Sequence, residues 1–200
     1  FKNDEEIVIE YEHKFAKIIG SGLCLSYAAA RMSFYEILRF KKIKKDDEII
    51  LLGFTCAVMA NAVQRIGAKI VYCDLDLNNY GSCPESINSF ISKNTKIIVA
   101  QHSFGIPCEI AKIVEIAKSK KIFLIEDCSL SLSSKFNNII LGNFGDAAIF
   151  STDHTKPINT ITGGMLYTKN KNLIKFINSQ KKNYREITDI NKKYLWDLFC

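Results

Sequence analysis

Several patterns that identify common protein classes are missing from this 200-residue sequence. It contains no CxxC pair, and its seven cysteines are an odd number placed mostly in apolar stretches. This usage argues against a disulfide scaffold or a zinc site. It favours reduced, buried thiols in a cytoplasmic protein without a metal site. No apolar run approaches the ~18 residues that span a membrane, and no signal peptide is recognised, so no membrane partner is expected.

Signatures of nucleotide and nucleic-acid binding are missing as well. No G-x-G-x-x-G follows a first strand and no P-loop occurs. A plain nucleotide-binding α/β domain is therefore supported only by the alternation of helices and strands described below. The net charge is +6, but the lysines are spread through the chain, and no arginine-rich cluster is interleaved with aromatic residues. Nucleic acid is therefore not expected as a partner.

What the sequence does contain is an alternation of helical patterns with short apolar runs. Helices are predicted over residues 5–20, 28–43, 55–67, 84–92 and 108–121, and strands over 46–53, 68–76, 95–101, 122–129, 145–151 and 163–170. Strands that are apolar along their whole length and separated by helices are typical of buried parallel sheets. The sequence therefore predicts an α/β fold with a mostly parallel sheet flanked by helices on both faces.

The pattern changes at about Asn172. From there to residue 200 the chain is helical in period and polar, and it contains no predicted strand. Its aromatic stretch YLWDLF is typical of a core or a subunit interface. We expect one domain over residues 1–171 and a helical segment over residues 172–200.

In open α/β sheets, ligands bind beyond the carboxyl ends of the parallel strands. This rule selects residues that are far apart in the sequence and predicts that they converge on one rim. The predicted rim consists of Ser26 and its neighbours, 54–56, 101–105, 127–130 and 151–156.

Two residues on this rim are candidates for chemistry. Asp127 ends a predicted strand next to Glu126, which strand alternation places on the opposite side. A carboxylate here suits a helix N-cap or a metal ligand, or an ion pair with a protonated heterocycle. Lys156 is either a solvated loop lysine or, if desolvated in a pocket, a nucleophile towards carbonyl groups. The following Gly163 and Gly164 favour the second role of Lys156, because glycine permits close approach of the backbone.

Short motifs in a fixed order connect these residues to a known family. The motifs are EYEHKFAKIIG, DDEIILLGFTCAVMANAVQRIGAKIVYCDLD, HSFGIPCEI, IEDCSLSLSS and GNFGDAAIFSTDHTKPINTITGGM. From about residue 9 to residue 169, the chain resembles the large domain of the pyridoxal-phosphate (PLP)-dependent sugar aminotransferases. These form the DegT/DnrJ/EryC1/StrS group and have the aspartate-aminotransferase fold, type I. Each motif is weak alone, and the specificity of the resemblance comes from their order and spacing.

The resemblance implies that residues 1–171 form a PLP-binding large domain and that residues 172–200 lead towards a small C-terminal domain, which is missing or truncated. It also implies a role for several positions. Lys156 would form the internal aldimine with PLP, and Asp127 would pair with the pyridinium nitrogen of the cofactor. Ser151 would hydrogen-bond the phosphate. Ala30 and Arg31 stand where the family has a Gly-Thr pair at a helix start, whose amides hold the phosphate, and an arginine there could add a bidentate grip.

Other positions depart from the pattern of the family or are weaker candidates. Cys56 stands where many members place an aromatic ring over the cofactor. Leu130 stands where the family usually has Gln or His near the phenolic oxygen, and leucine cannot hydrogen-bond. His102 and His154 are candidate substrate contacts, and the alternative for His102 is a structural bond to a neighbouring loop.

The function implied by the resemblance is a PLP-dependent transamination that converts a keto-sugar nucleotide to an amino-sugar nucleotide for a surface polysaccharide or glycan. The amino donor is expected to be an amino acid, glutamate or glutamine, and a second subunit of a homodimer is expected to complete the site. Two alternatives stay open: a non-catalytic member that binds PLP or a nucleotide sugar, and a sugar dehydratase. Members with His at the position of Lys156 are dehydratases, so Lys156 favours amino transfer.

Overall fold

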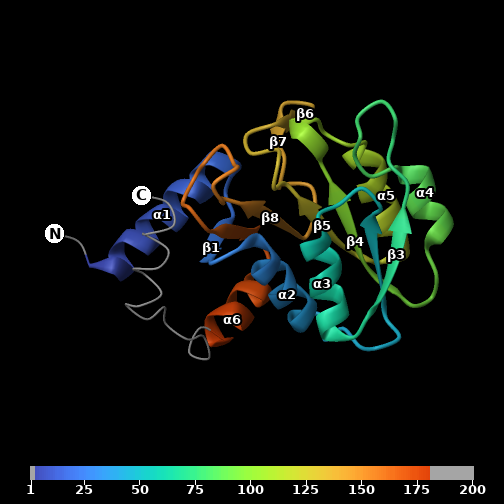
Figure 1. The fold of residues 1–200 in the computed structure, drawn as a ribbon, viewed down its shortest axis with the longest axis horizontal. Coiled ribbons are helices and arrows are strands. Elements are labelled where there is room, and N and C mark those ends of the chain that lie inside the picture. The colour runs from blue at the N-terminus through green and yellow to red at the C-terminus, as the bar shows by residue number, and fades with distance from the viewer. Residues whose placement is uncertain (1–2, 181–200) are drawn as a thin grey trace.

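The computed structural model describes residues 3–180 (Figure 1). Its helices are α1 (Asp4–Ile19), α2 (Ala30–Phe40), α3 (Ala57–Ile66), α4 (Pro84–Phe90), α5 (Ile110–Lys120) and α6 (Lys171–Gln180), with a 3-10 turn η1 (Ser103–Gly105). The strands are β1 (Leu23–Tyr27), β2 (Glu48–Leu52), β3 (Lys69–Cys73), β4 (Thr95–Gln101), β5 (Phe123–Asp127), β6 (Lys135–Phe136), β7 (Ile139–Ile140), β8 (Ala147–Ser151) and β9 (Gly164–Thr168). Every predicted helix and strand is present, with boundaries shifted by a few residues.

The main sheet has seven strands in the order β1-β9-β8-β5-β4-β2-β3. Strands β2, β3, β4, β5 and β8 pair in parallel, whereas β9 runs antiparallel to both of its neighbours, β1 and β8. The prediction of a mostly parallel sheet is confirmed. The direction of β9 follows from its connection: a loop joins β8 directly to β9 without a crossover helix, and such a connection returns the chain antiparallel.

Three strands, β1, β6 and β7, are absent from the sequence-based prediction. Strand β1 lies at the sheet edge, and only Cys24 and Leu25 of its five residues are buried, so its apolar run is too short to stand out. Strands β6 and β7 form a small separate hairpin. Its turn consists of Asn137 and Asn138, both with positive φ, which is the conformation that tight hairpin turns require.

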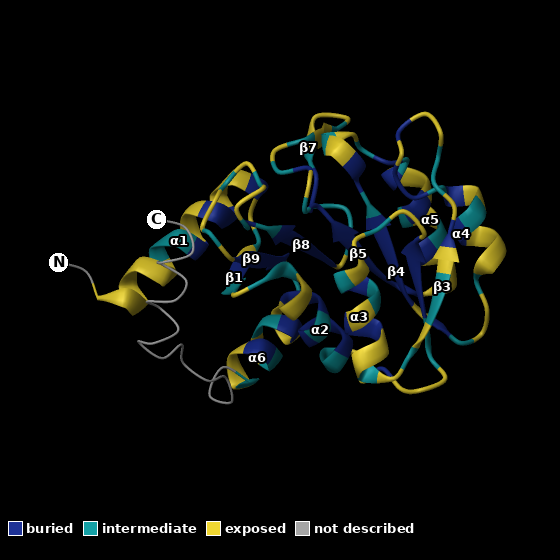
Figure 2. Ribbon diagram, in the orientation of Figure 1, coloured by how far each residue is buried: buried dark blue, intermediate teal, exposed yellow. Residues whose placement is uncertain are grey.

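Helices cover both faces of the main sheet, as predicted (Figure 1). On one face, α2, α3 and α6 pack over a single apolar cluster that includes Ile49, Ile125 and Ile149. The other face carries two clusters, one under α4 and α5 and one under α1. The central strands are buried along their whole length, while the helices are exposed on their outer sides (Figure 2). The core therefore holds the strand ends in fixed positions.

Helix α6 is the described part of the segment predicted to lead out of the domain. Its Leu173 and Ile177 are buried in the same cluster as α2 and β9. Helix α6 therefore packs against the sheet through these two residues. Residues 181–200, including the YLWDLF stretch, lie outside the described residues. None of the helices in the described residues combines the length and apolarity needed to cross a bilayer.

Candidate active site

A cavity of about 520 Å³ lies at the carboxyl ends of the parallel strands. Residues from all five predicted rim regions border it, although Ser26 itself does not. The lining residues used below are Ala28, Ala29, Ala30, Arg31, Cys56, His102, Asp127, Ser129, Leu130, Ser151, Asp153, His154, Lys156 and Gly163. Ser26 serves another purpose, because its amide and hydroxyl both donate to Glu12 of α1. The sequence-based prediction of one converging rim is otherwise confirmed.

Lys156 lies in the loop that joins β8 to β9. Backbone hydrogen bonds across this loop continue the β8–β9 hairpin: Thr152 N donates to Gly163 O at 3.0 Å, and Thr160 N donates to Thr152 O at 2.9 Å. Lys156 is half-buried and lines the cavity. Lys156 therefore lies at the rim of the cavity in a loop and not on a strand.

Asp153 stabilises the turn that leads to Lys156. Its Oδ1 accepts hydrogen bonds from the Thr155 amide at 2.9 Å and the Thr155 hydroxyl at 2.7 Å, and its Oδ2 accepts one from the Ser151 hydroxyl at 3.1 Å. Burial acts to raise the pKa of Asp153, but these hydrogen bonds and the charge of Lys156 outweigh it, so the pKa is lowered overall. Asp153 is therefore an ionised carboxylate at neutral pH.

Asp127 ends β5 and is only 7% exposed. Its Oδ1 accepts a hydrogen bond from the Ser129 amide at 3.0 Å. Within residues 3–180, no lysine, arginine or histidine forms an ion pair with it. A nearly buried carboxylate without a cationic partner is costly, and the cavity beside it offers a place for a cationic ligand.

The start of α2 and the end of the Lys156 loop meet at another part of the cavity. Ala29, the N-cap of α2, provides no side-chain hydrogen bond to the first turn, and the first turn carries no acidic residue. A Cβ at Gly164 would collide with the backbone of Ala30, so the glycine is required for this close approach. Ser151 and Arg31 line the cavity near by. A helix N-terminus without a cap, a hydroxyl and a guanidinium together suit an anion.

Cys56 and Leu130 also border the cavity. Cys56 is the N-cap of α3, and its free thiol is exposed to the cavity. Leu130 is 40% exposed and borders the same space. Both positions present small or apolar groups where the family pattern predicts an aromatic ring and a hydrogen-bonding side chain.

The DegT/DnrJ/EryC1/StrS aminotransferase family model matches residues 3–191 of the chain. The chain belongs to this family. GDP-perosamine synthase of Escherichia coli O157:H7 is 32% identical over 164 residues, which are 82% of this chain and 45% of that protein. GDP-4-keto-6-deoxy-D-mannose 3-dehydratase of Escherichia coli O55:H7 is 30% identical, over 84% of this chain and 45% of the dehydratase.

Solved structures of the family share the fold. The aminotransferase from Psychrobacter cryohalolentis superposes with a TM-score of 0.85 at 25% identity, over 92% of this chain and 47% of its own. The chain thus spans about half the length of the relatives it matches. The family is PLP-dependent and consists mostly of aminotransferases with some dehydratases, and one dehydratase structure holds hydrated PLP. The predicted family and the type I large-domain fold are confirmed.

The residues of this chain fit the cofactor of the DegT/DnrJ/EryC1/StrS family. Among the described residues the carboxylate of Asp127 has no cationic partner, which suits a partner of a protonated ring nitrogen. The glycine approach to α2 and the uncapped first turn suit a phosphate. Lys156 borders the same cavity. These three features lie in separate segments of the chain, and Asp127, Lys156 and Gly164 belong to the family motifs.

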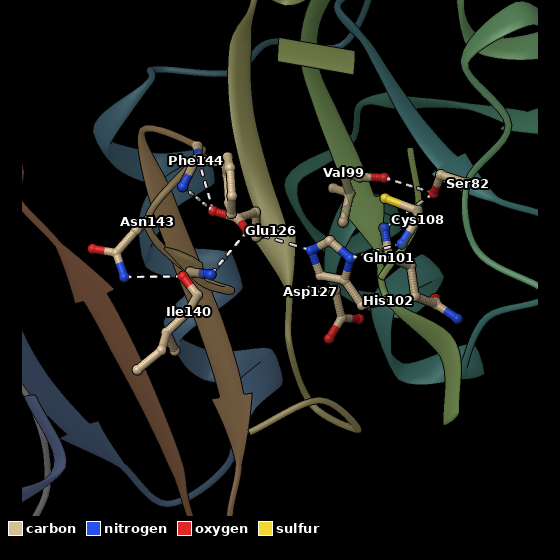
Figure 3. Close-up of polar contacts among 12 residues, drawn as sticks. Ser82, Val99, Gln101, His102, Cys108, Glu126, Asp127, Ile140, Asn143 and Phe144 are labelled. Atoms are coloured by element: carbon tan, nitrogen blue, oxygen red, sulfur yellow. Dashed lines mark hydrogen bonds and ion pairs between the residues drawn. The ribbon is translucent and has the colours of Figure 1, made fainter. Parts of the chain in front are cut away.

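His102 is placed differently from a substrate contact. Its side chain is fully buried, and both ring nitrogens are engaged. Nδ1 accepts a hydrogen bond from the Cys108 amide at 3.2 Å, so the proton resides on Nε2, which faces Glu126 Oε2 at 3.3 Å (Figure 3). This arrangement favours the structural alternative for His102. His154 is exposed at the cavity edge, where its amide donates to Ile161 O at 3.1 Å.

Glu126 forms a closed polar centre next to the site. Its Oε1 accepts hydrogen bonds from the amides of Phe144 at 2.7 Å and Gly145 at 2.8 Å, and its Oε2 accepts one from Gly142 at 2.8 Å besides facing His102. Cys128, with Glu126 and His102, completes a buried trio whose ligand atoms lie within 4.8 Å of one another. Backbone donors and the His102 ring already occupy both carboxylate oxygens, so this trio is a structural hub rather than a metal centre.

Sequence reasoning assigned no role to several lining residues, although they lie on or next to the predicted rim. Ala28 and Ala29 precede the helix start that was predicted to bind the phosphate, and Ser129 caps Asp127 through its amide. Asp153 is the omission with the largest consequence. The available signal was its spacing, because an aspartate two residues after Ser151 and two before Thr155 is placed to accept local hydrogen bonds.

Proposed function

We propose that this chain is the large domain of a PLP-dependent aminotransferase that converts a keto-sugar nucleotide to an amino-sugar nucleotide. The observation that supports it most is the convergence of Lys156 and Asp127 on one cavity at the carboxyl ends of the strands. A lysine alone would be a surface residue, and an aspartate alone would be a cap. Together, in a PLP-dependent family, they provide the two groups that the reaction chemistry requires.

Asp127 and Lys156 have distinct proposed tasks. When bound, PLP supplies an electron-withdrawing ring that stabilises negative charge at the reacting carbon. The Asp127 carboxylate would keep the ring nitrogen protonated, because an adjacent negative charge favours the charged form of a base. Lys156 Nζ would hold the cofactor and, when free, would accept and return a proton at the reacting carbon.

The anion-binding part of the cavity is proposed to hold the phosphate of the cofactor. The first-turn amides of Ala30 and Arg31, at the uncapped start of α2, would donate to an anion bound there, and the Ser151 hydroxyl could donate to it as well. The Arg31 guanidinium adds charge and forked donors. Cys56 would lie against the ring in place of an aromatic side chain, and sulfur makes a weaker contact with a π face than a second ring does.

The substrate class is proposed from the relatives. GDP-perosamine synthase and a dTDP-3-amino-3,6-dideoxy-alpha-D-galactopyranose transaminase are named for nucleotide-linked amino sugars. We propose the same class of substrate here, with an amino acid such as glutamate or glutamine as amino donor, for a surface polysaccharide or glycan. A homodimer is proposed to complete the site. His154, at the cavity edge, is proposed as a substrate contact.

Two alternatives use the same cavity. A dehydratase reaction is favoured by the 30% identity to the GDP-4-keto-6-deoxy-D-mannose 3-dehydratase, but Lys156 stands where dehydratases of the family have a histidine. A non-catalytic binding protein is favoured by Leu130, which brings no polar atom to the cavity. The present proposal rests on Lys156, because a covalent link to the cofactor needs an amine.

The decisive test is a covalent trap. Purified protein is mixed with PLP, reduced with borohydride, digested and analysed by mass spectrometry. We expect absorbance at the edge of the visible range before reduction, and a cofactor-labelled peptide at Lys156 after it. Lys156→Ala is expected to lose both. A Lys156→Ala protein that still forms the chromophore would contradict the assignment.

The reaction class is tested with substrate. The full chain, loaded with PLP, is mixed with candidate keto-sugar nucleotides and glutamate, and the products are identified by mass spectrometry. A primary amine on the sugar supports amino transfer, whereas a sugar that has lost a hydroxyl supports dehydration. A protein that binds PLP but whose spectrum does not change on addition of glutamate supports the non-catalytic alternative.

A further inference from the structure

Asp153 places a negative charge where the proposed function places the phosphate of the cofactor. The inference drawn from it rests on that proposed function. Asp153 lines the same cavity as Ser151, Lys156 and the start of α2. Since it has a lowered pKa, it stays ionised at neutral pH. A carboxylate beside a phosphate site weakens anion binding, because like charges repel strongly at short distance.

The Ser151 hydroxyl is already engaged by Asp153. A serine hydroxyl has one proton to donate, and here that proton is donated to Asp153 Oδ2 across 3.1 Å. A phosphate oxygen that accepts from Ser151 must therefore take this proton from Asp153. The Ser151 oxygen keeps its lone pairs, but these do not help an anion. Asp153 and the phosphate thus need the same hydrogen atom.

The two oxygens of Asp153 have separate tasks. Oδ1 accepts both hydrogen bonds from Thr155, which shape the turn before Lys156, and Oδ2 accepts the bond from Ser151. This separation has a useful consequence. In an asparagine at this position, the amide oxygen can keep both bonds to Thr155, while the amide nitrogen replaces the oxygen that engages Ser151. Asp153→Asn therefore removes the charge and the competition but retains the turn.

We propose that Asp153 is a built-in competitor for the anion at this end of the cavity. Its Oδ2 holds the Ser151 hydroxyl proton that a phosphate oxygen would otherwise accept, and its charge opposes the phosphate. Binding of the cofactor phosphate then requires Asp153 to release Ser151. The wild-type protein accordingly binds phosphate-bearing ligands less tightly than its hydrogen-bonding groups would otherwise allow.

The experiment compares three ligands with four proteins. PLP, pyridoxal and inorganic phosphate are titrated into the wild type, Asp153→Asn, Ser151→Ala and Thr155→Ala, and each Kd is measured by calorimetry. We expect Asp153→Asn to bind PLP and inorganic phosphate about tenfold more tightly, a factor reasonable for removing one nearby like charge. Its affinity for pyridoxal, which has no phosphate, should not change. Ser151→Ala should bind PLP less tightly than Asp153→Asn does.

Thr155→Ala is the control for the turn. It weakens the same turn but keeps the Asp153 charge, so it should not tighten phosphate binding. Circular dichroism and thermal unfolding show whether each variant is folded. The inference is overturned if folded Asp153→Asn binds PLP no more tightly than the wild type. It is also overturned if pyridoxal gains as much affinity as PLP, or if Thr155→Ala reproduces the gain.

This design separates the inference from the proposed function. If no variant binds PLP or pyridoxal, the proposed function fails. Inorganic phosphate, which does not react with Lys156, then still decides about Asp153. Tighter phosphate binding by Asp153→Asn supports the competition. Equal phosphate binding, or none by any of the four proteins, overturns it.

Discussion

Two adjacent carboxylates at the end of β5 have opposite environments. Glu126 is fully buried, and four hydrogen-bond donors surround it, three from the backbone of residues 142–145 and one from His102. Asp127 is 7% exposed, accepts one hydrogen bond through its side chain and borders the cavity. In Figure 3 the two side chains leave the strand in different directions.

The difference shows how one strand serves both architecture and chemistry. A buried carboxylate must be compensated by donors or by a cation. The protein supplies all the donors for Glu126 and so joins two strands and a loop on the side of α1 and α5. It leaves Asp127 with capacity to bind more. We infer that the uncompensated side is the functional one.

The largest expected effect is on the stability of the protein and concerns Glu126. Its side of β5 is called the closed side here, because hydrogen-bond donors surround the carboxylate. In Glu126→Gln, an amide group would face two of the four donors, so two buried hydrogen bonds would be lost. We expect the free energy of unfolding to fall by about 3 kcal/mol. Urea denaturation followed by circular dichroism measures this loss. His102→Gln should be less damaging, because it removes one donor and leaves the three backbone contacts.

An unchanged midpoint of unfolding in Glu126→Gln would show that the hub contributes little to stability. It would also remove the contrast between the two carboxylates. Asp127→Asn is the matched control, since it makes the same chemical change one residue further on. An asparagine oxygen can still accept from the Ser129 amide, so stability should change by less than about 0.5 kcal/mol.

The next expected effect is on cofactor affinity and concerns Asp127, on the open side of β5 that borders the cavity. Asp127→Asn removes the charge proposed to pair with the cofactor ring. We expect the Kd for PLP to rise by about 10-fold or more, which corresponds to the loss of one close ion pair. Titration of the cofactor by absorbance measures the change. A variant that binds PLP as tightly as the wild type, with the same spectrum, would argue against the ion pair.

Thiol reactivity provides a further comparison of the two sides. Burial and the charge of Glu126 raise the pKa of the Cys128 thiol well above its ordinary value, whereas Cys56 is exposed at the cavity. We expect iodoacetamide at pH 8 to label Cys56 at least ~100-fold faster than Cys128, since only the thiolate reacts. Peptide mass spectrometry measures both rates. Bound PLP should slow only Cys56, and equal rates would show that the buried side opens readily.

The smallest expected effect is a dependence of stability on alkaline pH. Burial, with a contribution from Glu12, raises the pKa of Cys24 to about 12, and burial raises that of Cys73 to about 12. The folded state therefore keeps these protons while the unfolded state releases them above about pH 9. Their contribution to stability is fully present below that pH and is lost as pH rises from 9 towards 12. At pH 10 we expect a loss of about 1 kcal/mol for each thiol.

Urea unfolding between pH 8 and pH 10 measures this loss. Cys24→Ala and Cys73→Ala should each flatten the pH dependence, whatever their effect on stability at neutral pH. A pH profile that is identical in the single variants and in the wild type would locate the titrating groups elsewhere.

Most of the architecture was predictable because its signals are local. The apolar runs of β4 and β5 and the helical periods of α3 and α5 lie within single segments of sequence. Strand β1 was missed because an edge strand buries too few residues to produce such a run. The location of Asp127 and Lys156 at the cavity was predictable from strand ends and family motifs. The engagement of Ser151 by Asp153 was not, because hydrogen-bond choice depends on the folded geometry of the loop.

The sequence by itself determined that Glu126 and Asp127 point to opposite sides of β5, because side chains alternate along any strand. It also determined the order of the family motifs, and with it the rim on which Lys156 lies. Only the tertiary structure decided which side is closed, since the donors for Glu126 come from the 142–145 loop and from His102, which follows β4. It likewise decided that β9 lies between β1 and β8 and brings Gly164 against Ala30. Periodicity is a property of the local chain, whereas compensation of a buried charge depends on which distant segments pack around it.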